Sequence, residues 1–180
     1  MRWAEYERLA AHEAGHASAA IVLNIPVRSA QIHSQGGVVW LEWGFDDEDP
    51  IAWCRRWCVM TLAGPLGDGR EAPRWPLRDS DPAPQDEQDL AEWTALMRFN
   101  ESDYKELVDD AEALFVDKGF RRLHYILEEE LLKRPVLGSD RIETIRAVVD
   151  AVLLDDRIDE LEQRVEELTK RREEAAPCPA

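Results

Sequence analysis

The chain has 180 residues, of which 38 are acidic and 22 basic, so its formal net charge is −16. This length predicts one domain that can bury a core. The negative charge argues against nucleic acid or an anionic membrane as a partner, because their phosphates would be repelled. Three cysteines do not form a disulfide framework, and the longest apolar run, residues 17–27, is too short for a bilayer. We expect a soluble, cytoplasmic protein.

Residues 3–23 predict a buried helix, because small and apolar side chains cover much of its surface. Asn24 to Pro26 ends this helix, since proline cannot continue the hydrogen-bond ladder. The following residues split into two strand-like runs around Gly36 and Gly37, which predicts a hairpin.

A second helix is expected over about 51–63, with Asp49 as its cap and Pro50 at its first position. Residues 64–85 are rich in glycine, proline and aspartate and form the longest loop signal. Loops of this length in a compact domain are often functional or mobile.

Three further helices are expected near 86–99, 103–117 and 119–133, and a long final helix follows, capped by Ser139 or Asp140. Its apolar residues alternate four and three apart, which predicts a short coiled coil. They are Ala147, Ala151, Leu154, Ile158, Leu161, Val165 and Leu168. The predicted fold class is mainly α with a small β-hairpin or sheet (α+β). We expect a domain over 1–150, a coiled-coil extension over 151–172 and a disordered tail over 173–180.

The first helix contains the sequence His12-Glu13-Ala14-Gly15-His16. Positions i and i+4 share one helix face, so the two imidazoles can bind one zinc ion. Glu13 is rotated by one position and can take a proton from a water on the metal. A helix with two hydrogen-bonded core histidines is the structural alternative. It is disfavoured because unliganded polar pairs are costly in apolar surroundings.

A catalytic zinc needs a third protein ligand and an open position, and a carboxylate is the natural supplier. His33 and His124 stand alone in the sequence and are interpreted as surface or core-edge histidines. Zinc is preferred over iron or manganese on the donor types alone. Trp53 and Trp57 are expected in the core, and Cys54 and Cys58 are expected to be buried free thiols.

The segments AAHEAGHA (10–17), TLAG (61–64) and DEQDLAEWTALM (86–97) resemble the peptidase domain of the FtsH-type zinc proteases. The resemblance covers most of residues 4–148. It implies that His12 and His16 are ligands, that Glu13 is the base, and that Asp89 before Leu90 is the third ligand.

The alternative role for Asp89 is helix capping or dipole compensation, shared with Asp86 and Glu87. Asp68 stands where the family has a glutamate. It is either a partner that holds a ligand histidine in place or a competing third ligand.

The chain has no Gly-rich phosphate loop and no membrane segment, so ATP-driven unfolding is not expected from it. The sequence therefore predicts an ATP-independent zinc metallopeptidase, with one zinc per chain, that cleaves unfolded or flexible polypeptides. A substrate strand is expected along Val38, Val39 and Trp40 at the hairpin edge. A homo-oligomer through the C-terminal helix is expected. The alternatives are a catalytically silent zinc-binding sensor or adaptor that acts through protein–protein contacts, and a purely helical scaffold.

Overall fold

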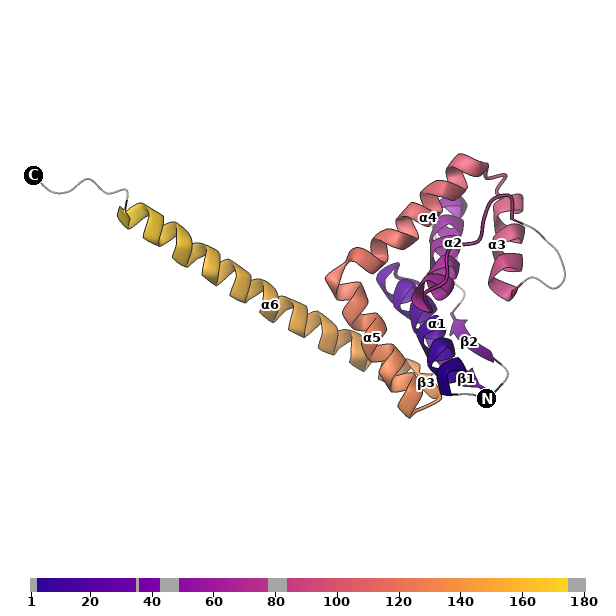
Figure 1. The fold of residues 1–180 in the computed structure, drawn as a ribbon, viewed down its shortest axis with the longest axis horizontal. Helices are drawn as coiled ribbons and strands as arrows, with labels where there is room; N and C mark the ends of the chain where they lie inside the picture. Colours follow the sequence, from indigo (N-terminus) through magenta and orange to yellow (C-terminus); the bar gives the residue numbers. More distant parts are fainter. Residues whose placement is uncertain (1–2, 35, 43–48, 78–83, 175–180) are drawn as a thin grey trace, which may run out of the picture.

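The computed structural model describes residues 3–34, 36–42, 49–77 and 84–174. Within them the fold is mainly helical with one small antiparallel sheet (Figure 1), so the predicted α+β class is confirmed. The elements in chain order are α1 (Trp3–Val22), β1 (Val27–His33), β2 (Gly36–Leu41), α2 (Pro50–Gly67), α3 (Gln85–Leu96), α4 (Glu101–Val116), α5 (Lys118–Lys133), β3 (Val136–Gly138) and α6 (Ser139–Glu174).

Helix α1 lies in the middle of the molecule and packs on α2, α5 and the sheet. Its residues 13–21 are all buried, as the sequence predicted. Gly15 lies directly on α2, where a Cβ atom would overlap the carbonyl oxygen of Ala63. The two helices therefore meet at backbone contact, which only glycine permits at this position.

The sheet has the order β2-β1-β3, and both pairs are antiparallel. The predicted hairpin is present, but Gly36 and Gly37 lie in β2 instead of in the turn. Strand β3 was not predicted, because its three residues carry no periodic pattern and form a strand only by pairing with β1, as Leu137 does with Ala30. Among the described residues β2 pairs only with β1, so it is an edge strand of the sheet.

Helix α2 begins as predicted, with the Asp49 carboxylate accepting a hydrogen bond from the Ile51 amide at 3.0 Å and Pro50 in the first turn. It ends four residues later than expected, because it continues through Pro65 to Gly67. Proline removes one backbone donor, but Pro65 is buried, and the contact of α2 with α1 outweighs that loss.

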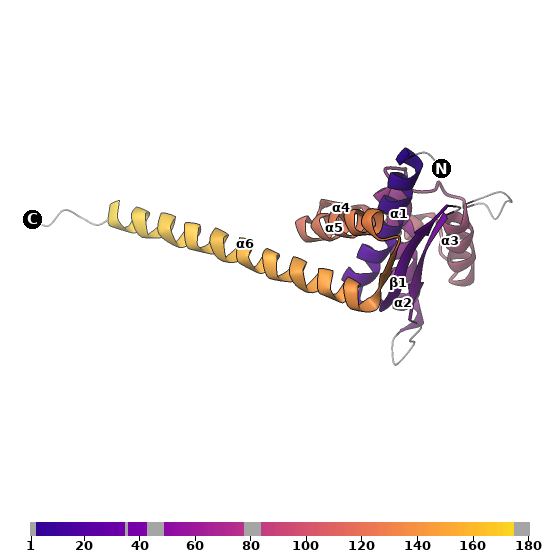
Figure 2. The same cartoon turned by 90° about the horizontal axis from the view of Figure 1, so that it is seen from below.

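Helix α6 packs on the body with its first turns and then projects away from it (Figures 1 and 2). Ile142, Ile145 and Val149 are the buried body-facing residues. Three members of the predicted heptad seam are exposed instead: Ala147, Ala151 and Leu154. The helix starts at Ser139 itself and runs to Glu174, so residues 173–174 of the predicted tail are helical. Residues 175–180 lie outside the described part.

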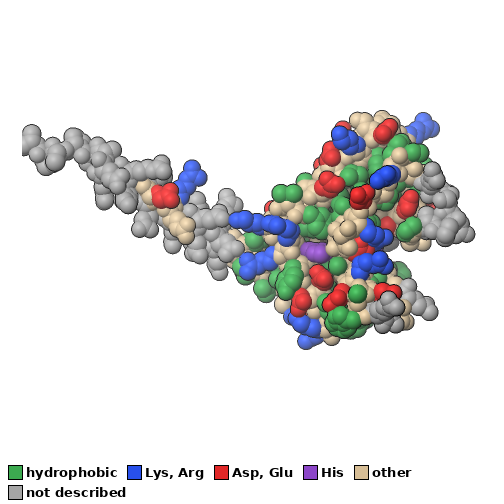
Figure 3. Space-filling view, in the orientation of Figure 1, with side chains coloured by type: hydrophobic (Ala, Val, Ile, Leu, Met, Phe, Trp, Pro, Cys, Tyr) green, Lys and Arg blue, Asp and Glu red, His purple; other side chains and the backbone are tan. Residues whose placement is uncertain are grey.

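None of the described helices has both the length and the apolarity needed to cross a bilayer. On the face shown in Figure 3, acidic and basic side chains are interspersed with apolar groups over the body. The cleft described next lies between α1, α2, β2 and the start of α3.

Candidate metal centre

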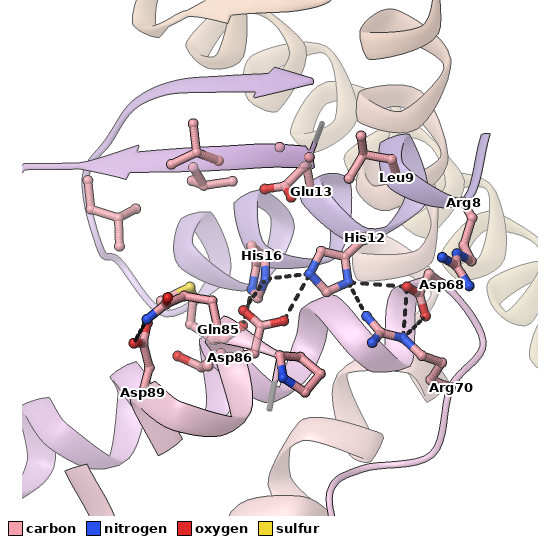
Figure 4. Close-up of a pocket in the computed structure, with 18 of the residues that line it drawn as sticks. Arg8, Leu9, His12, Glu13, His16, Asp68, Arg70, Gln85, Asp86 and Asp89 are labelled. Atoms are coloured by element: carbon pink, nitrogen blue, oxygen red, sulfur yellow. Dashed lines mark hydrogen bonds and ion pairs between the residues drawn. The ribbon is translucent and has the colours of Figure 1, made fainter. Parts of the chain in front are cut away.

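Three side chains from two helices converge at one point (Figure 4): His12 and His16 on α1, and Asp86 in the first turn of α3. The two Nε2 atoms are 3.1 Å apart. Asp86 places Oδ2 3.0 Å from Nε2 of His12 and Oδ1 3.3 Å from Nε2 of His16. Two nitrogens and a carboxylate thus share one small volume.

This donor set fits a tetrahedral divalent ion. Zinc ligands lie roughly 2.0–2.1 Å from the ion, which puts neighbouring tetrahedral donors about 3.3 Å apart. The distance of 3.1 Å between the two Nε2 atoms is close to that spacing, and each Nε2 has a different oxygen of Asp86 at 3.0 or 3.3 Å. Two imidazole nitrogens that face each other with lone pairs repel unless a cation or a proton lies between them. The residues present therefore suit a metal.

The far side of each imidazole also has an oxygen partner. His16 has Nδ1 3.0 Å from the Met60 carbonyl oxygen, and His12 has Nδ1 3.3 Å from Oδ2 of Asp68. An Nδ1–H group that donates to an oxygen leaves Nε2 with its lone pair free for the metal. The contact of His16 with the Met60 carbonyl is the one expected around a metal-binding histidine, whereas Nδ1 of His12 also lies 2.9 Å from Nη2 of Arg70.

The side chains in the cluster shift one another's pKa values. Burial alone would lower the pKa of His16. The hydrogen bond and the negative charge of Asp86 have a larger opposite effect and raise the pKa to about 9. Burial raises the pKa of Asp86, and hydrogen bonds from His12 and His16 then bring it well below its ordinary value. Asp86 and the histidines therefore favour each other's charged forms.

Glu13 lies on the same turn and is buried, with 4% of its surface exposed. Burial raises the pKa of its carboxyl group, and the neighbouring histidines oppose that shift. The side chain lies against β2 so closely that a Cβ atom on Gly37 would overlap it. A carboxylate with a raised pKa is a stronger base than an exposed one and, beside two histidines, is suited to accept a proton.

The cluster opens into a cleft of about 560 Å³. Val38 and Val39 of the edge strand β2 line one side, and Trp57 and Met60 of α2 line another. Trp40 is 55% exposed and does not line the cleft. Two of the three predicted substrate-strand residues thus line the cleft.

The carboxylate that faces the histidines is Asp86, not the predicted Asp89. Asp89 lines the same cleft, but its Oδ1 accepts a hydrogen bond from Nε2 of Gln85 at 2.6 Å (Figure 4). Both aspartates lie in the first turns of α3, and the sequence does not show from which angle that helix enters the site. From the sequence, Asp86 is expected only to cap helix α3 or to compensate its dipole. Its place directly after the proline-rich loop was the available signal.

Asp68 lies behind His12 and is not one of the three clustered donors. This position agrees with the first of its two predicted roles, as a partner that holds a ligand histidine. Arg70, which sequence reasoning missed, pairs with Asp68 and also lines the cleft.

The other two histidines lie outside the cluster. His33 is exposed at the end of β1, and His124 is partly buried, with Nε2 donating to the Ala11 carbonyl oxygen at 2.9 Å. Cys54 and Cys58 are buried and free as predicted, and burial raises the pKa of Cys58 to about 12.

Trp53 is buried and stacks on Trp57 with ring centroids 5.1 Å apart. The core prediction holds fully for Trp53. Trp57 packs against the core but also borders the cleft.

A scan against protein-family models and a search of the curated proteins both give no match to this chain.

Proposed function

We propose that the protein is an ATP-independent zinc metallopeptidase that hydrolyses peptide bonds in unfolded or flexible polypeptides. The observation that carries the proposal is the convergence of His12, His16 and Asp86 at metal-ligand spacing, beside the buried carboxylate of Glu13. The resemblance of the 10–17 segment to the FtsH-type peptidases supports the same reading.

In this proposal His12, His16 and Asp86 hold the ion. A bound zinc ion would act as a Lewis acid that polarises a carbonyl group and activates water. Glu13 is the proton carrier: it accepts a proton from the attacking water and gives it to the leaving amine. Burial raises the pKa of its carboxyl group, which makes Glu13 a stronger base than an exposed glutamate.

The position of β2 at the edge of the sheet is the reason for proposing a polypeptide substrate. A peptide in extended form can pair with the edge of β2 that does not contact β1. In this proposal it would then run past His12, His16 and Asp86. Val38 and Val39 border that path. Only an unfolded or flexible segment offers such a free strand, which is why folded proteins are not proposed as substrates.

The first test is metal content, with a matched pair of variants. Purified parent protein is expected to hold about one zinc per chain, measured by elemental analysis. Asp86→Ala is expected to lose most of the metal, whereas Asp89→Ala, on the same helix and in the same cleft, keeps it. Loss in Asp89→Ala with retention in Asp86→Ala would restore the third ligand predicted from the sequence.

The second test separates an enzyme from a binding protein. Parent protein is expected to cleave unfolded casein, and Glu13→Gln is expected to keep its zinc and lose that activity by a factor of roughly 100 or more. Zinc without cleavage by the parent would favour the sensor or adaptor alternative. Absence of any bound metal in the parent would overturn the proposal.

A further inference from the structure

Behind His12 lies a second charged pair, formed by Asp68 and Arg70 just after α2 ends. The Asp68 side chain is only 3% exposed, and Arg70 is 42% exposed. Nε of Arg70 is 2.8 and 2.9 Å from the two carboxylate oxygens. A buried carboxylate without a cationic partner would destabilise the fold, and Arg70 offsets that loss of stability for Asp68.

The backbone around this pair is fixed as well. The Asp68 amide donates to the Gly64 carbonyl oxygen at 3.2 Å, and the Arg70 amide donates to that of Pro65 at 2.9 Å. Both residues therefore leave α2 along a defined path. The guanidinium meets the carboxylate without a long, freely turning loop between them.

Nδ1 of His12 faces both members of the pair. It is 3.3 Å from Oδ2 of Asp68 and 2.9 Å from Nη2 of Arg70. A guanidinium can only donate hydrogen bonds, whereas a carboxylate only accepts them. Metal binding through Nε2 requires the proton on Nδ1, and Asp68 is the acceptor for that proton.

We propose that Arg70 is a positioning residue for the metal centre: it holds Asp68 in place so that Asp68 orients His12 for metal binding. This inference rests on the proposed metal site. Arg70 acts on the ion only through Asp68 and His12. The contacts through Nε hold the Asp68 carboxylate.

The experiment compares zinc affinities, measured by competition with a chromophoric chelator on the full chain. Arg70→Ala is expected to lower the affinity by about 10–100-fold, as is typical for partners of metal-binding histidines. Arg70→Lys, which keeps the charge but not the fork, is expected to recover part of that loss. Arg74→Ala is the matched control, because Arg74 lies in the same loop and pairs only with an exposed Glu71 in the described part. It should leave the affinity unchanged.

Cobalt substitution gives a readout that a general loss of stability would not produce. The visible absorption of Co²⁺-loaded Arg70→Ala is expected to shift, because His12 is no longer held in one orientation. An Asp68→Asn variant should shift it similarly, and the double variant should lose no more affinity than the worse single variant.

The outcomes separate this inference from the proposed function. If the parent binds no zinc, the metal centre itself fails. If the parent binds zinc and Arg70→Ala binds it equally well with an unchanged cobalt spectrum, Arg70 has no positioning role. Tighter binding by Arg70→Ala would also overturn the inference. It would mean that the guanidinium competes with the metal by stabilising the opposite tautomer of His12.

Discussion

The two longest described helices, α1 and α6, pack very differently. The difference shows how far neighbouring elements restrict the choice of side chain along a helix. Helix α1 is enclosed by α2, α5 and the sheet, and atoms of neighbouring elements lie against nearly every side chain from residue 13 to 21. Helix α6 touches the body through its first turns and then projects from it. In α1, close packing restricts the size of the side chain, since a methyl group added at Gly15 would meet the backbone of α2. The projecting part of α6 lies away from the body, so packing on the body does not restrict its side chains in this way.

The largest effect is expected where α1 touches α2. Gly15→Ala would place a methyl group on the Ala63 carbonyl oxygen, so α1 and α2 would have to move apart. Overpacking costs about 1–3 kcal/mol of unfolding free energy, and we expect the upper end of that range because the methyl group meets backbone. Urea denaturation followed by tryptophan fluorescence measures it.

The control is a glycine with free space around it. Gly138→Ala in β3 adds a methyl group that meets no atom within 4 Å in the described structure, so its unfolding free energy should stay within about 0.5 kcal/mol of the parent. Equal stability of the two variants would contradict the close packing of α1 on α2.

A second prediction concerns Glu13, the proposed base. Gly37→Ala would drive a methyl group into the Glu13 side chain from the strand side. The metal ligands come from α1 and α3, so zinc content should stay near that of the parent while casein cleavage falls by about 10–100-fold. Gly138→Ala serves again as a control, with unchanged cleavage. Loss of zinc together with activity would mean that β2 supports the ligands and not only the base.

The contrast between the two helices also marks what the sequence could predict. The helix order, the buried first helix and the pair His12 and His16 follow from local patterns, because spacing along one helix fixes which residues share a face. Asp86 could not be chosen over Asp89, because the choice depends on the angle at which α3 approaches α1. Arg70 was equally hidden, since its proposed role depends on Asp68, at the end of α2, lying against His12 on α1.

The two faces of α6 allow a third prediction. Ile145→Val removes one buried methylene on the body-facing side and should cost about 1 kcal/mol of unfolding free energy. Leu154→Ala changes a side chain that is 59% exposed and should change that energy by less than about 0.5 kcal/mol. Sedimentation of Leu154→Ala would test the predicted coiled coil, because a self-associating seam should weaken there.

The smallest effect is expected at the ion pair between α5 and α6. Arg141 donates to Oε2 of Glu130 from Nε at 3.0 Å and from Nη2 at 2.6 Å. This hydrogen bonding holds the pKa of the Glu130 carboxyl below its ordinary value. A lowered pKa in the folded state means that the pair stabilises the fold above the unfolded-state pKa. That stabilisation is lost as the pH falls through the folded-state value.

The pair lies near the surface, so its contribution is about 0.5–1 kcal/mol at neutral pH. Glu130→Gln should therefore be less stable than the parent by that amount at pH 7. The difference should shrink to near zero once the pH lies below the folded-state pKa, as measured by urea denaturation across the acid range. Glu129→Gln removes a neighbouring carboxylate that contacts Lys133 at 3.3 Å and not Arg141, so it should show a smaller difference. A constant gap between parent and Glu130→Gln at every pH would show that packing, and not charge, joins α5 to α6 at this point.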